Sequence, residues 1–264
     1  MAAKQKKKPR NRKSAPTSKA PAALWLYGRH ATLAALNNPA RPLRRVLATQ
    51  SALDWLADAT APPALIARIK PATAAEIDQA LPPGAVHQGL AAEVDDLPRA
   101  RLKDACADPQ PGAPVIVLDQ VTDPQNIGAI FRSAAAFNAR AVIFQDRRTP
   151  PLAGALAKAA AGAIETVPTV SVVNIARAIE GLQGLGYHCA GLAGGAAAPI
   201  ATLDNRAPLA IIMGAEGQGL RKLVADTCDS LLRIEIAPDI ESLNVSTAAA
   251  IALYEATRQP QEGE

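Results

Sequence analysis

The feature that most constrains the fold is an alternation of apolar runs and helical segments that begins at Pro114 and continues almost to the end of the chain. Runs such as VIVLD (115–119) and LAIIMG (209–214) are nearly continuous in apolar residues, whereas a half-exposed strand would alternate polar and apolar positions. Continuous apolar strands separated by helices are typical of a mostly parallel sheet with helices on both faces. The second half of the chain is therefore expected to form an α/β domain.

The same pattern gives the approximate limits of the elements in this half. Strands are expected at 115–119, 140–144, 164–170, 188–193, 209–214 and 231–236, and helices at 126–137, 154–163, 173–183, 219–227 and 243–259. Ligands of such sheets bind beyond the carboxyl ends of the strands. The loops after Asp119, Met213 and Ile236 are therefore the expected positions of a site.

A smaller set of elements precedes this domain. An apolar start and a helix are expected within 24–38, strands at 42–49 and 86–94, helices at 51–60 and 72–81, and a strand or helix edge at 64–70. This pattern predicts a small α/β domain over 23–98 and a linker rich in proline and charge at 99–113, and it leaves 114–260 for the larger domain.

The charges are distributed unevenly along the chain. The formal net charge is +4, yet twelve of the 28 Lys and Arg residues precede the first acid, Asp54. Residues 1–22 are too polar and too basic to bury a core, so they are expected to be a disordered arm. Such an arm favours contact with a polyanion, RNA or DNA ahead of a membrane because no apolar face accompanies the charge; the alternative is a solubilising tail.

Several function classes are disfavoured by composition. The apolar runs are too short to span a bilayer and the N-terminus has no signal-peptide core, so a cytoplasmic protein is expected. The three cysteines, Cys106, Cys189 and Cys228, have no ligand or disulfide spacing and are expected to be inert. A nicotinamide-dependent oxidoreductase is disfavoured because no GxGxxG loop is present.

The stretch DPQNIGAIFRS (123–133) follows the first strand of the large domain. Asp123 is a plausible N-cap and Pro124 suits the first helical position. The helix start can bind an anion, Arg132 leans back toward it, and Gly128 leaves room for Arg132 or for a ligand. The alternative reading is structural, with Asn126 as a helix-start amide and the guanidinium directed to solvent.

Two further stretches follow later strands. IIMGAEGQGLRK (211–222) holds three glycines within six residues, which indicates a tight loop with a close backbone approach; Glu216 is its only ionisable residue, and a solvated carboxylate is the structural alternative. IESLNVSTAAAIALYE (240–255) gathers Ser242, Asn244 and other polar residues before an alanine-rich helix that is expected to be buried. They exceed what capping requires, so a ligand is expected there.

Together the three stretches resemble the ordered motifs of the SpoU (TrmH-type) RNA ribose 2′-O-methyltransferases of the SPOUT superfamily, most closely the 23S rRNA (guanosine-2′-O-)-methyltransferase branch. YGRHA and HQG in the first half resemble the small L30e-like RNA-binding domain of that branch. The resemblance implies a deep trefoil knot in the C-terminal domain, S-adenosylmethionine as the cofactor, a homodimer with the site completed across its interface, and no metal.

The resemblance also implies roles for particular residues. Catalytic roles fall to Asn126, Arg132, Glu216, Ser242 and Asn244, with Asn126, Glu216 and Asn244 expected to hold both Arg132 and the ribose in place. Cofactor contacts fall to Leu192, Gly214, Ile234 and Leu243. The chain departs from the usual motif at Glu235, Ile236 and Pro238, and Asn138 replaces a glycine in a position where asparagine tolerates a left-handed backbone.

The sequence therefore predicts methylation of a ribose 2′-hydroxyl in structured RNA, with 23S rRNA favoured. The alternatives are a ribose methyltransferase that acts on tRNA, and a noncatalytic RNA-binding protein on the same fold.

Overall fold

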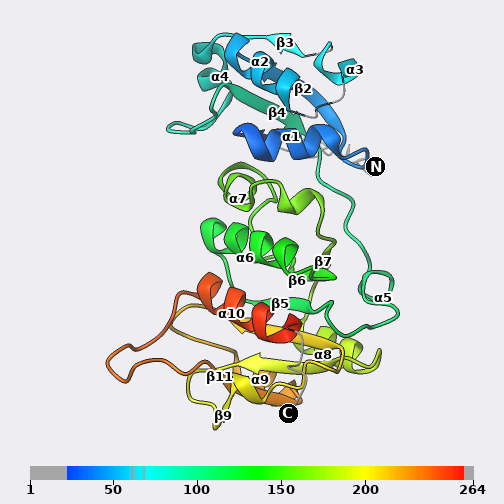
Figure 1. Cartoon of the computed structure of the whole chain (residues 1–264), viewed down its shortest axis with the longest axis vertical. Coiled ribbons are helices and arrows are strands. Elements are labelled where there is room, and N and C mark those ends of the chain that lie inside the picture. The colour runs from blue at the N-terminus through cyan, green and yellow to red at the C-terminus, as the bar shows by residue number, and fades with distance from the viewer. Residues whose placement is uncertain (1–22, 60, 62, 68, 259–264) are drawn as a thin grey trace, which may run out of the picture.

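The computed structural model describes residues 23–59, 61, 63–67 and 69–258, and the predicted basic arm at 1–22 lies outside them. The described residues form a four-stranded sheet followed by a seven-stranded sheet (Figure 1). Among the described residues, the strand pairs of the larger sheet are all parallel. The predicted α/β class with a mostly parallel sheet is therefore confirmed.

The smaller sheet has the strand order β1-β4-β2-β3. Strand β4 pairs antiparallel with both β1 and β2, and β2 pairs parallel with β3. The elements of this part are β1 Leu24–Tyr27, α1 Arg29–Asn37, β2 Leu43–Ala48, α2 Gln50–Asp58, α3 Pro63–Ile66, β3 Lys70–Pro71, α4 Ala74–Ala80 and β4 Leu90–Val94.

The larger sheet has the order β7-β6-β5-β10-β8-β11-β9. Its strands are β5 Val115–Asp119, β6 Ala141–Gln145, β7 Thr169–Val172, β8 His188–Leu192, β9 Ala198–Pro199, β10 Leu209–Gly214 and β11 Ser230–Arg233. Its helices are α6 Pro124–Ala136, α7 Gly154–Ala160, η1 Ala163–Glu165, α8 Ile175–Gln183, η2 Ile200–Thr202, α9 Lys222–Thr227 and α10 Val245–Thr257, where η1 and η2 are 3₁₀ turns. In the described part of the chain, no helix is long and apolar enough to cross a membrane.

Both faces of the larger sheet are covered, which explains its continuous apolar strands. Ile116 and Leu118 of β5 belong to the core that contains α6 and α10, whereas Val115 and Val117 belong to the core that contains α8. Alternate residues of one strand therefore enter two cores. Strand β5 is buried along its whole length, and it ends in a buried carboxylate at Asp119.

The predicted strand at 86–94 is formed only over Leu90–Val94, and two predicted strands of the larger sheet also have other limits in the structure. Ala163–Glu165 is a 3₁₀ turn and β7 begins only at Thr169, after Pro168, which has no N–H for a sheet ladder. Strand β11 stops at Arg233 because its outer neighbour β9 ends at Pro199 and turns into η2. The short strand β9 has no clear signal in the sequence.

Two predictions concern the longest helices, α6 and α10: the backbone conformation after α6 and the burial of α10. Asn138 follows α6 with a φ of 51°, so the predicted left-handed conformation is confirmed. Helix α10 is buried on one face only: Leu253 is fully buried, while Tyr254 is 56% exposed and lies edge-on to Phe137. The prediction that this helix is buried is therefore wrong for its outer face, because only one side of each turn faces the core.

The two sheets are joined through a continuous apolar contact. Leu26 and Val94 of the small sheet and Ala35 of α1 belong to the same buried cluster as Leu156 of α7 and Ile164. Figure 1 shows α1 lying beside α7 at this junction. The small domain therefore rests directly on the helical layer of the large one.

A buried ion pair crosses the same junction. Arg41 donates from Nη2 and Nε to Oε1 of Glu165 at 2.6 and 3.0 Å, and Asn38 donates to its Oε2 at 2.8 Å. The side chains of Arg41 and Glu165 are 0% and 4% exposed. The third guanidinium nitrogen of Arg41 donates to the carbonyl of Asp95 at 2.9 Å, so the paired charges are well supplied with partners.

The predicted linker packs against the large domain. It contains α5 Leu102–Ala105, and the N–H of Ala100 donates to the carbonyl of Thr169 at 3.0 Å. Cys106 is fully buried, and Arg140 donates to the carbonyl of Ala105 at 2.9 Å. The connection is therefore a packed segment of the structure.

Candidate active site

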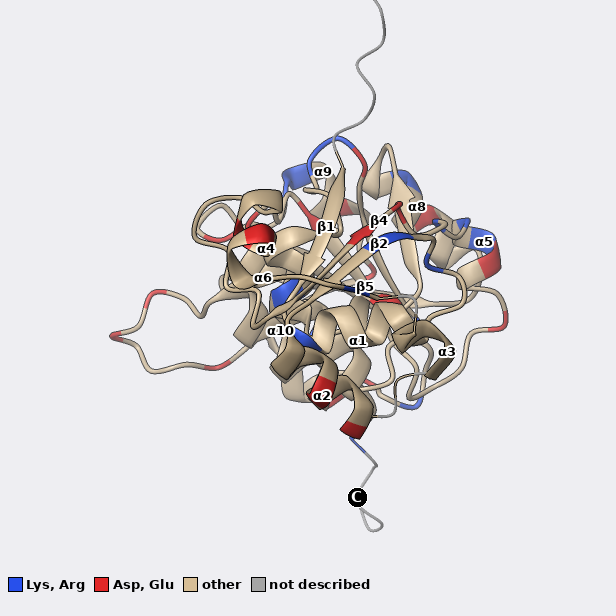
Figure 2. Ribbon diagram, turned by 90° about the horizontal axis from the view of Figure 1, so that it is seen from above, with Lys and Arg blue, Asp and Glu red and all other residues tan. Residues whose placement is uncertain are grey.

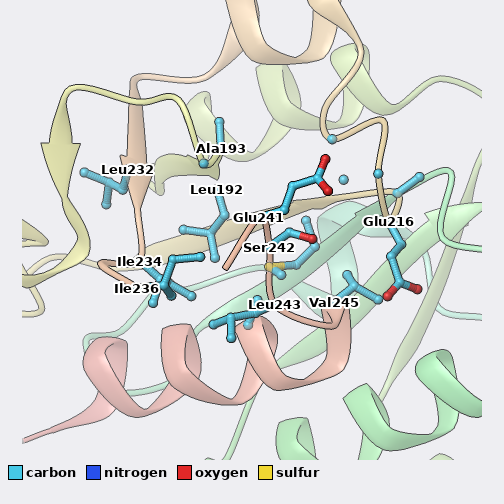
Figure 3. A pocket seen from close by; sticks show the side chains of 17 residues that line it. Leu192, Ala193, Glu216, Leu232, Ile234, Ile236, Glu241, Ser242, Leu243 and Val245 are labelled. Atoms are coloured by element: carbon cyan, nitrogen blue, oxygen red, sulfur yellow. The ribbon is translucent and has the colours of Figure 1, made fainter. Parts of the chain in front are cut away.

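A cavity of about 300 Å³ lies at the carboxyl edge of the larger sheet, beyond β8, β10 and β11 (Figure 3). Its lining comes from the strand ends, the glycine loop after β10, the loop before α10 and the first turn of α10. The lining residues are Leu192, Ala193, Gly194, Met213, Gly214, Ala215, Glu216, Gly217, Gly219, Leu232, Ile234, Ile236, Glu241, Ser242, Leu243, Val245 and Ala248. The cavity thus occupies the edge where ligands of parallel sheets bind.

The four residues predicted to contact a cofactor all line this cavity. Leu192 ends β8, Gly214 ends β10, Ile234 follows β11, and Leu243 precedes α10. Glu216 and Ser242, predicted as catalytic, also line it. The structure therefore gathers six of the nine predicted site residues around one space, although it holds no ligand that would test their roles.

The glycine loop after β10 folds back on its own strand. A Cβ on Gly214 would lie 2.2 Å from the carbonyl carbon of Gly219, so only glycine fits there. Gly219 donates from its N–H to the carbonyl of Ala215 at 2.8 Å, and Gly217 and Gly219 have φ values of 75° and 65°. The close backbone approach predicted from the sequence is therefore present, and it is made by the loop itself.

Three predicted residues form a hydrogen-bonded chain beside the cavity. Asn244 donates from Nδ2 to Oδ1 of Asn126 at 2.9 Å, and Asn126 donates from Nδ2 to Oε2 of Glu216 at 3.4 Å. Oδ1 of Asn244 accepts from the N–H of Ser246 at 2.9 Å. Because that oxygen caps α10, the amide must present its donors to Asn126, and the direction of the chain follows.

This chain joins the three sequence stretches at one point. Asn126 stands at the start of α6, where its N–H donates to the capping carboxylate of Asp123 at 2.8 Å. Figure 3 shows the Glu216 carboxylate directed toward α6, and the Glu241 carboxylate directed toward the glycine loop. Capping therefore explains part of this polar cluster, and contacts between helices explain another part.

Arg132 is not part of the chain. It is exposed, and none of the described residues makes a side-chain hydrogen bond or an ion pair with it. Arg132 is six residues beyond Asn126 on α6, a rise of about 9 Å along the helix. Within one chain, Asn126, Glu216 and Asn244 therefore contact one another and not Arg132, and their expected role toward Arg132 and the ribose stays a prediction.

Gly128 also has another role than the predicted one. A Cβ at this position would lie 2.5 Å from Cβ of Ala159 and 2.6 Å from the carbonyl oxygen of Leu156. Gly128 is thus buried against α7 and permits close helix packing, and it leaves no space for a guanidinium or a ligand. The prediction for Gly128 is wrong because the sequence did not show which neighbour this face meets.

Sequence reasoning assigned no role to some of the residues that line the cavity. Glu241 and Ile236 flank the predicted residues in the loop between β11 and α10, and Met213 precedes Gly214. This loop extends from the body of the large domain and carries acidic but no basic residues (Figure 2). The crowding of polar residues there was the available signal, and Glu241 is part of it.

The three cysteine thiols, which lie outside the cavity, do not form a competing catalytic centre. Burial raises the pKa of the Cys106 thiol to about 11, and of the Cys189 and Cys228 thiols to about 12, so these thiols stay protonated and unreactive at neutral pH. Within residues 23–59, 61, 63–67 and 69–258, no three His, Cys, Asp or Glu side chains are grouped so as to hold a metal ion.

Comparison with known proteins identifies relatives of the whole arrangement. The model of the SpoU rRNA Methylase family matches residues 113–254. A Burkholderia protein named 23S rRNA (guanosine-2′-O-)-methyltransferase RlmB is 44% identical over 174 residues, which are 66% of this chain and 70% of the relative. A Pseudomonas putida protein of the same name is 35% identical over 251 residues, which cover 89% of this chain and 96% of the relative.

Solved structures show the same fold. An rRNA methyltransferase from Sinorhizobium meliloti, crystallised with AdoMet, matches with a TM-score of 0.72 and 23% identity over 89% of this chain and 86% of that one. The SpoU methyltransferase AviRb from Streptomyces viridochromogenes matches with a TM-score of 0.71 and 23% identity, covering 90% of this chain and 89% of the other.

Proposed function

Because the chain belongs to the SpoU rRNA methylase family, we propose that it transfers a methyl group from S-adenosylmethionine to a ribose 2′-hydroxyl in RNA, and that the substrate is a guanosine of 23S rRNA. The observation that carries this proposal is the convergence of the three motif stretches beside one cavity, in a chain that matches a relative of that activity over nearly its whole length.

The cavity suits the proposed cofactor. Its volume of about 300 Å³ lies at the lower end of small-molecule sites. Leu192, Ile234 and Leu243 provide apolar walls, and Gly214 leaves backbone atoms accessible. The Glu241 carboxylate, which is directed toward the glycine loop, supplies the negative charge that a ligand with ammonium and sulfonium charges needs nearby.

The bound cofactor supplies an electrophilic methyl group, and the residues of the chain supply position. Asn126, Glu216 and Asn244 tie the starts of α6 and α10 to the glycine loop, which fixes the wall of the cavity nearest α6. Ser242 presents a hydroxyl at the cavity, where a ribose can be hydrogen-bonded. Such fixed positions lower the barrier because the reacting groups are already oriented.

Arg132 is proposed to bind RNA phosphate from the exposed side of α6. A guanidinium holds phosphate with two parallel hydrogen bonds and stays protonated at neutral pH, so it serves as an anion contact and no base role is assigned to it. The distance from Arg132 to the Asn126 chain favours an arrangement in which a homodimer brings Arg132 of one protomer to the cavity of its partner.

We extend the proposal to the remaining parts of the chain. Residues 23–98 form an L30e-like substrate-binding domain, 114–260 form a methyltransferase domain with the knot of the family, and the arm at 1–22 contacts RNA phosphates. The cytoplasm, where RNA of the ribosome is accessible, is the proposed compartment. No metal takes part in the proposed reaction.

The test is transfer of radiolabelled methyl groups from S-adenosylmethionine to total RNA of a strain that lacks this protein. Label in 2′-O-methylguanosine of the 23S fraction is the expected result, and label in tRNA would replace the substrate while keeping the reaction. Arg132→Ala is expected to abolish methyl transfer. The control is Arg177→Ala, which is expected to keep it, because Arg177 is an exposed residue of α8 on the opposite face of the sheet. RNA binding by folded protein without any label would favour the noncatalytic alternative.

A further inference from the structure

A buried carboxylate outside the cavity holds one end of the glycine loop. Asp119 closes β5, and its side chain is 0% exposed. Its Oδ1 accepts from Nε and Nη2 of Arg221 at 2.8 and 2.5 Å, and its Oδ2 accepts from the N–H of Arg221 at 3.1 Å. Both oxygens of Asp119 are therefore taken by one residue that lies 102 positions later in the chain.

The two partners bracket the loop that lines the cavity. Gly214, where the loop begins, is in register with Asp119 in the parallel pair of β10 and β5. Arg221, where the loop ends, is the N-cap residue of α9. The loop between them includes Glu216, which reaches Asn126. Its start and its end are thus both fixed against the end of β5.

Neither Asp119 nor Arg221 lines the cavity, so the pair acts on it only through the loop. A buried ion pair is weak evidence for stability, since well-packed apolar residues of similar size often serve as well. The pair instead fixes the position of Arg221, because three hydrogen bonds from this residue end on the two carboxylate oxygens of Asp119. Two of the six residues at 215–220, Gly217 and Gly219, are glycines with positive φ, which leave the loop many conformations when its end is released.

We infer that the Asp119–Arg221 ion pair is a positioning element for the proposed methyl transfer, which holds residues 215–220 in the conformation that binds the cofactor. This inference rests on the proposed function. Without the pair, only a fraction of molecules has the loop in its binding conformation, and the apparent dissociation constant rises by the inverse of that fraction. Cofactor binding is therefore affected more than the turnover rate at saturating cofactor.

The experiment compares Arg221→Ala, Arg221→Lys and Asp119→Asn with Lys222→Ala, which removes an adjacent, exposed ion pair on α9. Binding of S-adenosylhomocysteine is measured by titration calorimetry, and KM for S-adenosylmethionine and kcat are measured separately. Arg221→Ala and Asp119→Asn are expected to raise the dissociation constant and KM at least tenfold with a smaller loss of kcat. Arg221→Lys restores part of the affinity because it keeps a cation opposite Asp119, and Lys222→Ala changes neither value.

Amide hydrogen exchange of residues 215–220 gives a readout that needs no ligand. Exchange is expected to be faster in Arg221→Ala and unchanged in Lys222→Ala. Should Asp119→Asn or Arg221→Ala not fold, since each leaves one member of the buried pair without its partner, the double variant Asp119→Asn/Arg221→Gln, which leaves no unpaired charge, decides instead. The inference is overturned if folded Arg221→Ala keeps both the affinity for the cofactor and the exchange rate of the wild type. If the wild-type chain binds no cofactor, yet residues 215–220 exchange faster in Arg221→Ala than in the wild type, the proposed function alone is overturned.

Discussion

Replacing Glu165 by alanine should destabilise the protein through the junction of its two domains. The change removes the carboxylate that accepts from Arg41 and Asn38 and leaves a guanidinium whose side chain is 0% exposed. Arg41 would keep only its hydrogen bond to the carbonyl of Asp95. Removing one partner of a buried pair costs about 3–5 kcal/mol, because the remaining charge is left without compensation.

The assay is urea unfolding followed by far-UV circular dichroism, with Asp226→Ala as the control. Asp226 pairs with Lys222 on the surface, where the side chains are 56% and 89% exposed, so its removal should cost less than about 1 kcal/mol. A third variant that replaces Arg41 by methionine and Glu165 by leucine should recover much of the loss, because no unpaired charge remains. A cost for Glu165→Ala no larger than that of the control would refute the reasoning.

Three more predictions concern other parts of the chain. Gly128→Ala should lower the free energy of unfolding by about 1–3 kcal/mol in thermal or urea unfolding, because the added methyl group meets α7 within 2.6 Å; an unchanged midpoint would contradict the packing seen here. The pKa of Cys189 and Cys228 is raised by burial from 9.0 to about 12, so the folded state holds these protons more tightly than the unfolded chain. Their contribution to stability is therefore complete below pH 9 and is lost as the pH rises toward 12, and urea midpoints at pH 8 and 10 should show the decline. Deleting residues 1–20 should weaken RNA binding and flatten its dependence on salt in a filter-binding series, whereas an equal slope would make the arm a solubilising tail.

The order of most elements followed from local patterns in the sequence. Continuous apolar strands such as β10 require burial on both faces, and this requirement indicated the class of fold. The local patterns also indicated the loops at the strand ends, whereas the individual cavity residues Gly214, Ile234 and Leu243 came from the resemblance to the family. Asn138 was accessible from the sequence, because its backbone conformation depends on the residue itself.

Contacts between residues that are far apart in the sequence could not be predicted from local patterns. Arg41 and Glu165 are 124 residues apart, and nothing near either residue indicates that their charges are buried together. The face on which Gly128 lies was read correctly as needing space, but the sequence did not indicate that α7 fills it. The separation of Arg132 from Asn126, in contrast, followed from the expected helix at 126–137, because six residues rise about 9 Å along a helix.

The junction between the two sheets has a consequence for how RNA can be selected. Apolar contact and the Arg41–Glu165 pair fasten the small domain to the layer of the large one that contains α7, so in this structure the small domain lies at one set distance from the cavity. An RNA that touches both must carry its recognition element and its target ribose at that spacing. Substrate choice then depends on length as well as on sequence, because an RNA with an extra base pair between the two points engages one of them and loses the gain of simultaneous binding.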